Sequence, residues 1–209
     1  MTTYHVIIRC NNGDFQLRDR QDFTELLGVV ARYKAKYRFK LFGYCIMNSH
    51  AHLIVRTPGD EKASISKIMH DVMWRYAMKY NRRQGRKGHF FGERFKSPII
   101  ETDSYGVALI RYIAQNPVRA GMVGRAREWE WSSYSVYEDG ADDVLVDLMP
   151  SFLGLAANRK RCAAHLRELV DGTSAKQDES WSRTCVIGTE HFVKVTLAAF
   201  GMGNDPPPG

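Results

Sequence analysis

The stretch RFKLFGYCIMNSHAHLIVRT, residues 38–57, decides the fold that this sequence predicts. Residues 38–47 have the apolar and aromatic composition of a strand, and residues 50–57 have it again after the short Asn48-Ser49 connection. Two strands joined by so short a connection pair antiparallel. The sequence therefore predicts a hairpin at the centre of the fold.

The chain before this hairpin predicts one strand and one helix. Residues 4–10 (YHVIIRC) are rich in β-branched and aromatic types, which favours a strand. Asp22 and Glu25 have the spacing of a capping box, and apolar residues then recur at helical spacing to about Lys36. A β-α unit thus precedes the hairpin.

The chain after the hairpin predicts helix, strand and helix. Apolar residues at helical spacing follow Ser64, and Gly85 ends that helix. Residues 94–101 predict a short strand, which its proline places at an edge or a bulge. A last helix, capped by Asp103, should stop near Asn116 because the next residue is proline.

The resulting order, β-α-β-β-α-β-α, is typical of a ferredoxin-like α/β sandwich in the α+β class. We expect an antiparallel sheet with helices on one face and the other face open for a ligand. This core should occupy residues 1–137. Residues 138–209 then predict a small helical C-terminal extension that ends in a disordered tail.

Composition excludes several classes of protein. The chain has 209 residues, of which 44% are hydrophobic and 25% charged, so it is not mainly disordered. No apolar run approaches the ~18 residues of a membrane span. The N-terminal residues do not resemble a secretory signal, and the four cysteines lie far apart without a CxxC pair. We therefore expect a cytoplasmic protein with unpaired thiols and no membrane partner.

Positive charge is concentrated in the first two-thirds of the chain. The net charge is +7, yet residues 138–209 carry more acidic than basic side chains. Residues 75–96 hold eight Lys and Arg against one Glu, with five aromatic residues between them. Such a stripe suits a polyanion whose bases can stack, that is, nucleic acid. A solvated basic helix face is the alternative, and charge alone does not exclude it.

His50 and His52 flank Ala51 at the start of the second hairpin strand. Because side chains alternate along a strand, both imidazoles lie on one face and make half of a metal site. The alternative is a pair of half-buried structural histidines.

Tyr112 and Asn116 lie four residues apart, on one face of the last predicted helix. A tyrosine with a pKa near ~10 is a weak nucleophile, and a nearby divalent cation lowers that pKa. The amide oxygen of Asn116 could be a third, harder ligand, which suits Mg²⁺ or Mn²⁺ better than zinc. A core-facing aromatic residue and a helix-end residue are the alternatives.

Three segments together resemble a known family. GYCIMNSHAHLIV (43–55) resembles the His-hydrophobic-His segment of the HUH single-tyrosine transposases. GHFFGERFKSPIIETDSYGVALIRYIAQNPVRAGMV (88–123) resembles the second conserved block of their REP-associated branch, and WEWSSY (129–134) resembles the segment that follows. The resemblance covers about residues 3–137 and implies a ferredoxin-like sandwich, as the order of elements does.

The resemblance also implies an activity and a site. His50 and His52 would be metal ligands for Mg²⁺ or Mn²⁺, Tyr112 the nucleophile, and Asn116 the position where relatives carry a third polar ligand. Such enzymes cut and rejoin single-stranded DNA, often near a hairpin, through a 5′-phosphotyrosine and a free 3′-hydroxyl. Relatives include monomers and dimers, so a homodimer stays open.

Two departures from the family pattern keep a second function open. No proline stands between Met47 and His50, and Ala51 is smaller than the usual bulky residue. A member that binds structured nucleic acid with little or no cleavage is therefore an alternative. An RNA-binding module is a third, since ferredoxin-like sheets often bind RNA.

Basic side chains near these blocks are the expected contacts to DNA. Phe90 or Phe91 could stack an unpaired base. Arg119 either neutralises the scissile phosphate or lies in solvent. His5 and the other isolated histidines are expected to be structural. The residues expected to hold backbone phosphates are Arg82, Arg83, Arg86, Lys87, Arg94 and Lys96.

Overall fold

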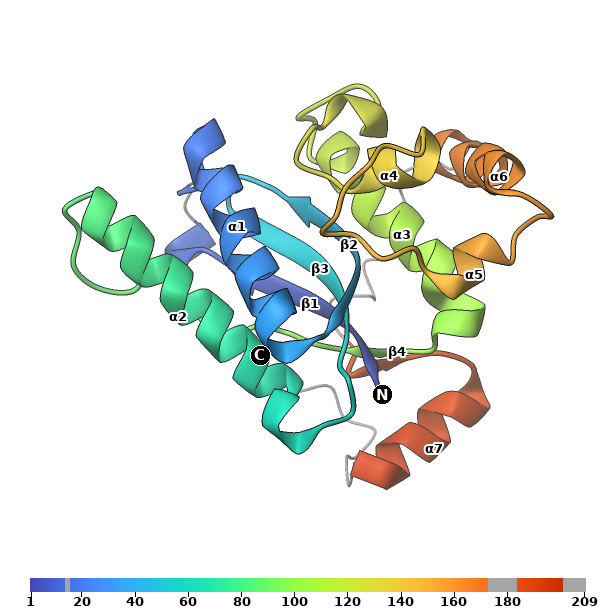
Figure 1. The fold of residues 1–209 in the computed structure, drawn as a ribbon, viewed down its shortest axis with the longest axis horizontal. Helices are drawn as coiled ribbons and strands as arrows, with labels where there is room; N and C mark the ends of the chain where they lie inside the picture. The colour runs from blue at the N-terminus through green and yellow to red at the C-terminus, as the bar shows by residue number, and fades with distance from the viewer. Residues whose placement is uncertain (14–15, 173–183, 201–209) are drawn as a thin grey trace.

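A five-stranded sheet in the order β2-β3-β1-β4-β5 forms the centre of the computed structural model, which describes residues 1–13, 16–172 and 184–200. The predicted α+β class and the order of the first seven elements are confirmed (Figure 1). The strands are β1 (Thr3–Arg9), β2 (Lys40–Ile46), β3 (His50–Arg56), β4 (Ile99–Ile100) and β5 (Val186–Ile187).

The predicted hairpin is the pair β2 and β3, and β1 lies on the other side of β3. β1 and β3 are antiparallel, with Ile7 opposite His52 and Arg9 opposite His50. Alternate residues of these strands point to opposite faces of the sheet. One face therefore carries Val6 and Leu53, and the other carries both histidines of β3.

Two helices cover the first of these faces, side by side in Figure 1: α1 (Arg20–Tyr37) and α2 (Ile65–Arg83). The predicted cap of α1 is wrong by one turn. Asp19 is the N-cap and accepts from the backbone N–H of Asp22, while the Asp22 carboxylate accepts from the N–H of Asp19. Asp22 is thus the N3 residue of the capping box and not its N-cap.

The opposite face is covered as well, so the expectation that helices lie on one face only is wrong. Helix α3 (Thr102–Arg119) packs on it, and its Leu109 and Ile113 share a buried cluster with Phe42 and Ile54 of the hairpin. The approach is close: a Cβ on Gly43 of β2 would lie 3.2 Å from the Ile113 side chain. The sheet face that the sequence predicted to be open is therefore the face on which α3 packs.

Helix α3 also begins and ends differently from the prediction. Glu101, not Asp103, is its N-cap, and it caps without a side-chain hydrogen bond. The helix continues through Pro117 to Arg119, and the Ala120 N–H still donates to the Asn116 carbonyl. A proline disfavours helix in the preceding residue, but burial of Asn116 and Pro117 against the sheet outweighs this local preference.

The predicted edge position of the fourth strand is wrong, because β5 pairs with β4 in parallel. β4 is also shorter than predicted, with Tyr4 of β1 opposite Ile99. The segment before it continues along β1 through isolated bridges, Ile7 to Lys96 and Cys10 to Phe91. The sheet is therefore mixed, with one parallel pair.

The C-terminal extension forms the expected helices. Met149, Phe152 and Leu166 are buried in the same cluster as α3, so α5 and α6 pack against that helix. The expected disordered tail falls in residues 201–209, outside the described residues. The remaining elements are η1 (Asn11–Gly13), η2 (Glu61–Ala63), η3 (Ala126–Glu128), α4 (Tyr134–Glu138), α5 (Pro150–Leu153), α6 (Arg159–Asp171) and α7 (Glu190–Phe200).

Among the helices of the described residues, none combines the length and the apolar character that crossing a membrane requires.

We predict that Asp22→Ala lowers the free energy of unfolding by about 3 kcal/mol, because it opens the capping box of α1 and leaves the Arg83 guanidinium with only its longer ion pair to Glu25. Urea denaturation measures the loss. Glu130→Ala is the control: it removes an ion pair to Arg20 whose side chains are 73% and 55% exposed, and should cost less than about 1 kcal/mol. Equal losses in the two variants would contradict the prediction.

Candidate functional site

Three histidines meet on the sheet face beneath α3. His50 and His52 of β3 lie on this face with ring centroids 5.0 Å apart. His5 of β1 lies edge to edge with His52, with centroids 5.1 Å apart and an interplanar angle of 22°. The predicted histidine pair is therefore part of a larger group drawn from two neighbouring strands.

His5 is a site residue that sequence reasoning missed. It is fully buried, and its Nε2 lies 2.8 Å from Nδ1 of His52 in a hydrogen bond. The sequence places His5 in the predicted first strand. Which residue of the neighbouring strand lies beside it depends on the register of the strand pairing. With Ile7 opposite His52, the diagonal neighbour on the same face is His5.

Helix α3 brings Tyr112 to this group. The half-buried phenol ring stands edge-on to His5 and His52, with centroids 5.7 Å and 6.0 Å away. The sequence predicted that a phenol from the last core helix and two imidazoles from the sheet would converge, and the structure places them together in a single chain.

Arg119 lies at the site rather than in solvent. Its guanidinium lies 4.2 Å above the centre of the Tyr112 ring and donates to the Tyr112 carbonyl and to Oδ1 of Asn116. Asn116 is buried, and its Nδ2 has no hydrogen-bond partner. The amide oxygen expected to be a third metal ligand is thus already an acceptor for Arg119.

The three imidazoles are neutral at physiological pH. Burial lowers the pKa of His5 to about 3. Burial, together with the positive charge of Arg9, lowers the pKa of His50 to about 4. Burial lowers the pKa of His52 well below its usual value, and the neighbouring histidines and arginines add to this. Neutral rings keep a nitrogen lone pair free for a metal ion.

The donor set fits two ligands of a divalent cation. His50 and His52 are neutral and adjacent. Nδ1 of His50 is hydrogen-bonded to Ser49, and Nδ1 of His52 is hydrogen-bonded to His5, which leaves Nε2 on each ring as the ligating atom. The described residues hold no group of three His, Cys, Asp or Glu arranged for a metal ion. Asn116 remains the candidate for a third protein ligand, because its amide oxygen accepts from Arg119 and has a second lone pair.

The predicted phosphate contacts fall into two groups. Arg83 forms ion pairs with Asp22 and Glu25, so its charge is neutralised within the fold. Arg86 is exposed and donates to Gln16, and Arg94 is exposed and donates to Ser66. Of the others, Arg82 and Lys87 are exposed and Lys96 is half-buried.

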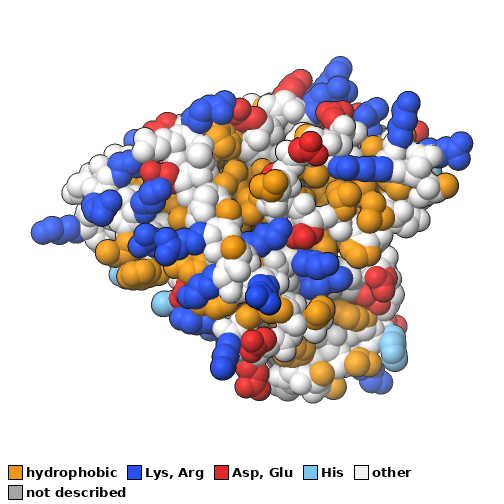
Figure 2. Space-filling view, in the orientation of Figure 1, with side chains coloured by type: hydrophobic (Ala, Val, Ile, Leu, Met, Phe, Trp, Pro, Cys, Tyr) orange, Lys and Arg blue, Asp and Glu red, His pale blue; other side chains and the backbone are white. Residues whose placement is uncertain are grey.

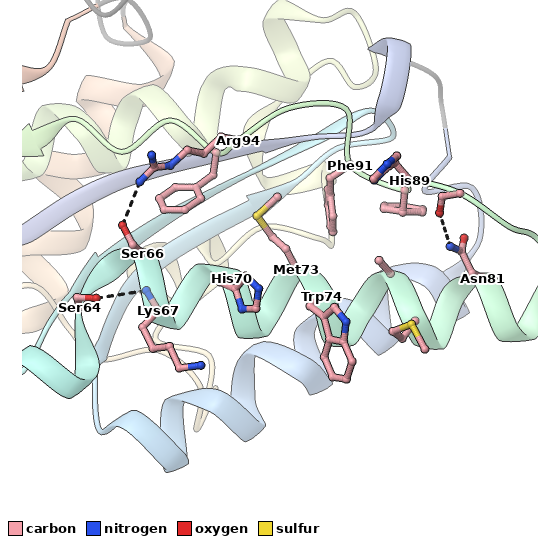
Figure 3. A pocket seen from close by; sticks show the side chains of 15 residues that line it. Ser64, Ser66, Lys67, His70, Met73, Trp74, Asn81, His89, Phe91 and Arg94 are labelled. Atoms are coloured by element: carbon pink, nitrogen blue, oxygen red, sulfur yellow. Dashed lines mark hydrogen bonds between the residues drawn. The ribbon is translucent and has the colours of Figure 1, made fainter.

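A groove of about 980 Å³ runs between α2 and residues 88–95 (Figure 3). Met73 and Phe91 point into it from opposite walls, while Trp74, 54% exposed, lies along its helix side. The expectation for Phe90 is wrong: it is buried, packed between Tyr76 and Tyr80 with centroids 5.1 Å and 4.5 Å away. Phe91 remains as the accessible ring.

A second hollow of about 640 Å³ adjoins the groove and shares Trp74 and Met78 with it. Sequence reasoning missed both residues, although they lie off the apolar stripe of α2, where large apolar side chains need another explanation. Figure 2 shows Lys and Arg side chains around hydrophobic surface at this end of the molecule. The basic residues that line the second hollow are Arg75, Lys79, Arg82, Arg86 and Lys87.

Comparison with known families decides the class of this protein. Residues 1–116, more than half of the chain, match the family described as "Transposase IS200 like". The chain belongs to the IS200-like transposase family. The resemblance inferred from the three sequence segments is thereby confirmed, and with it an assignment to DNA transposition.

A solved structure shows the same fold for this IS200-like transposase. A REP-associated tyrosine transposase solved with a REP hairpin is 19% identical, with a TM-score of 0.56 over 70% of this chain and 91% of that one. A putative transposase from Deinococcus radiodurans R1 is 15% identical, with a TM-score of 0.40 over 55% and 88% of the two chains. No curated protein matches the sequence.

We predict that the transposase loses stability as the pH falls from 7 to 5. The pKa values of the buried histidines lie below their unfolded value of ~6.5, so on acidification the unfolded chain takes up protons first. Each such histidine costs about 1–2 kcal/mol over this range. His5→Gln should reduce the loss by that amount in urea titrations at both pH values. Parallel losses in wild type and variant would contradict the prediction.

Proposed function

We propose that this transposase cuts and rejoins single-stranded DNA with Tyr112 as the nucleophile. The observation that carries the proposal is the convergence of the Tyr112 ring, the His5–His52 pair and the Arg119 guanidinium at one place in a single chain. Convergence of groups from the sheet and from a helix is what a phosphoryl-transfer site requires.

In the proposed cleavage step, the Tyr112 oxygen attacks a backbone phosphorus. A bond forms between phosphorus and the phenolic oxygen, and the bond to the 3′ oxygen breaks. The phenolic proton passes to solvent, and the leaving oxygen takes up a proton as a free 3′-hydroxyl. The phosphotyrosine ester retains the energy of the broken linkage, so a later attack by a 3′-hydroxyl rejoins DNA without ATP.

The surrounding residues have separate roles in this proposal. His50 and His52 hold a divalent cation, Mg²⁺ or Mn²⁺, which when bound lowers the pKa of the tyrosine and polarises the phosphate. Arg119 supplies positive charge beside the phenol, where charge develops on the phosphate during transfer.

The two adjoining hollows on α2 suit a single strand of DNA. The groove with Trp74, Met73 and Phe91 offers apolar and aromatic surface for an unpaired base. The second hollow offers Arg82 and Lys87 for the phosphates. A base-binding slot beside a phosphate-binding slot matches the alternating chemistry of a nucleotide chain.

The same segment of chain borders both the groove and the site. Residues 88–95 form one wall of the groove, and the Gly92 N–H donates to the carbonyl of Arg9 in β1. Arg9 lies opposite His50 in the register of the sheet, and its charge contributes to the low pKa of that histidine. A strand held in the groove can therefore continue along this edge towards Tyr112.

The proposed partner is single-stranded DNA next to a hairpin. The REP-associated transposase that shares this fold was solved bound to a REP hairpin, which supports this choice. Because the histidines and Tyr112 meet within one chain, we propose a site that is complete in a monomer.

We predict that wild type, incubated with Mn²⁺ and a hairpin that carries a single-stranded flank, forms a protein–DNA adduct that survives denaturing electrophoresis. Tyr112→Phe should form none, because the attacking oxygen is absent. His50→Ala and His52→Ala should slow adduct formation by at least about 100-fold, since the bound cation supplies several kcal/mol.

Tyr105→Phe is the matched control for Tyr112→Phe, because it removes a hydroxyl from the same helix and should leave the adduct unchanged. An adduct with Tyr112→Phe would refute the assignment of the nucleophile. Salt-dependent hairpin binding that survives EDTA, with no adduct in wild type, would support the alternative of a non-cutting binder.

We predict that Trp74→Ala raises the Kd for a hairpin with a single-stranded flank by about 5–100-fold, the loss expected for one stacked base. The Kd for a blunt hairpin of the same duplex should change by less than about twofold, because it offers no unpaired base. Fluorescence anisotropy with labelled DNA measures both values.

Phe200→Ala is the control for this variant, because Phe200 is 52% exposed on α7, outside the groove. Trp74→Phe should retain most of the affinity through its remaining ring. Equal weakening of the flanked and blunt hairpins would show that the groove does not take unpaired bases.

A further inference from the structure

We propose that His5 is a positioning residue for His52: when a metal ion binds, it accepts the Nδ1–H of His52 and so stabilises the one tautomer whose Nε2 can ligate. The inference rests on the proposed role of His52 as a ligand and goes beyond it by assigning a function to a third histidine. It is carried by the hydrogen bond of 2.8 Å between Nε2 of His5 and Nδ1 of His52, both in fully buried rings.

The contact fixes which nitrogen of His52 can ligate. Nδ1 of His52 is committed to His5, so Nε2 is the only ring atom left for a cation. A ligating nitrogen must carry a lone pair, and the single proton of the neutral ring must then be on Nδ1. In that tautomer the Nδ1–H of His52 donates and Nε2 of His5 accepts.

The proton of His5 must then be on its own Nδ1. That atom is buried and has no hydrogen-bond partner. An unpaired buried N–H costs more than an unpaired lone pair, because the donor is fully desolvated. Without a cation the pair therefore favours the opposite arrangement, in which Nε2–H of His5 donates to His52. When a cation binds, the proton of each ring moves from Nε2 to Nδ1.

Removal of the acceptor should leave the metal-binding tautomer of His52 without a hydrogen-bond partner. With phenylalanine at position 5, an aromatic ring remains beside His52 but nothing accepts from its Nδ1. The proton of His52 then prefers Nε2, where it blocks the ligating atom. Glutamine at position 5 can place an amide oxygen near the former Nε2 and accept the bond again.

The experiment is a titration of the metal-free protein with Mn²⁺ alone, followed by electron paramagnetic resonance. We expect His5→Phe to raise the Kd for Mn²⁺ by about 10–100-fold, the usual cost of losing such an outer partner. His5→Gln should recover most of the affinity. His165→Phe, an exposed histidine of α6, is the control and should bind as wild type does.

Thermal unfolding without metal separates positioning from a structural role. His5→Phe removes the unpaired Nδ1 of His5 but leaves Nδ1 of His52 without its partner, so its melting temperature should change little while its Mn²⁺ affinity falls. A parallel loss of stability and affinity that His5→Gln does not restore would overturn the inference.

The tautomer itself can be observed. Nitrogen-15 shifts of His52 should report a proton on Nδ1 when Mg²⁺ is bound and on Nε2 when it is absent. The outcomes are distinguishable. Unchanged Mn²⁺ affinity in His5→Phe overturns only the role of His5. Failure of wild type to bind Mn²⁺ overturns the metal-assisted part of the proposed function as well.

Discussion

β1 and β3 pair antiparallel with Ile7 opposite His52, and this register fixes the three histidines of the candidate site. It places His5 diagonally across from His52, close enough for a hydrogen bond in the interior. It also places Arg9 opposite His50 at the end of the sheet. A shift by one residue would turn His5 to the face beneath α1 and α2, where Val6 and Ile8 now pack.

The covered sheet face provides the chemical setting of the site. Because α3 and the C-terminal helices bury this face, the histidines stay neutral and keep their lone pairs available. The same helix carries Tyr112, so the packing that lowers the pKa of the histidines also delivers the proposed nucleophile. An open face, as the sequence suggested, would place the imidazoles in water and leave Tyr112 without a fixed position.

The sequence predicted the pairs whose spacing is local, and the family resemblance predicted that Tyr112 meets the histidines. It missed two hydrogen bonds that only the folded structure reveals. The sequence predicted that His50 and His52 lie on one face of a strand. It also predicted that Tyr112 and Asn116 lie one turn apart on a helix. Both are local features. The His5–His52 bond depends on strand register, and the bond from Arg119 to Asn116 depends on a helix that continues through Pro117 against the local rule.

The groove and the histidines belong to opposite faces of the sheet, so DNA that uses both must pass an edge. Among the described residues, β5 pairs with β4, the neighbour of β1 in the sheet, only at Ile99 and Ile100. The earlier part of that segment bridges β1 through Phe91 and Lys96. Phe91 lines the groove, and Lys96 lies between it and the covered end of the segment. In the proposed function, Lys96 can neutralise the phosphates of a strand that passes this edge from one face to the other.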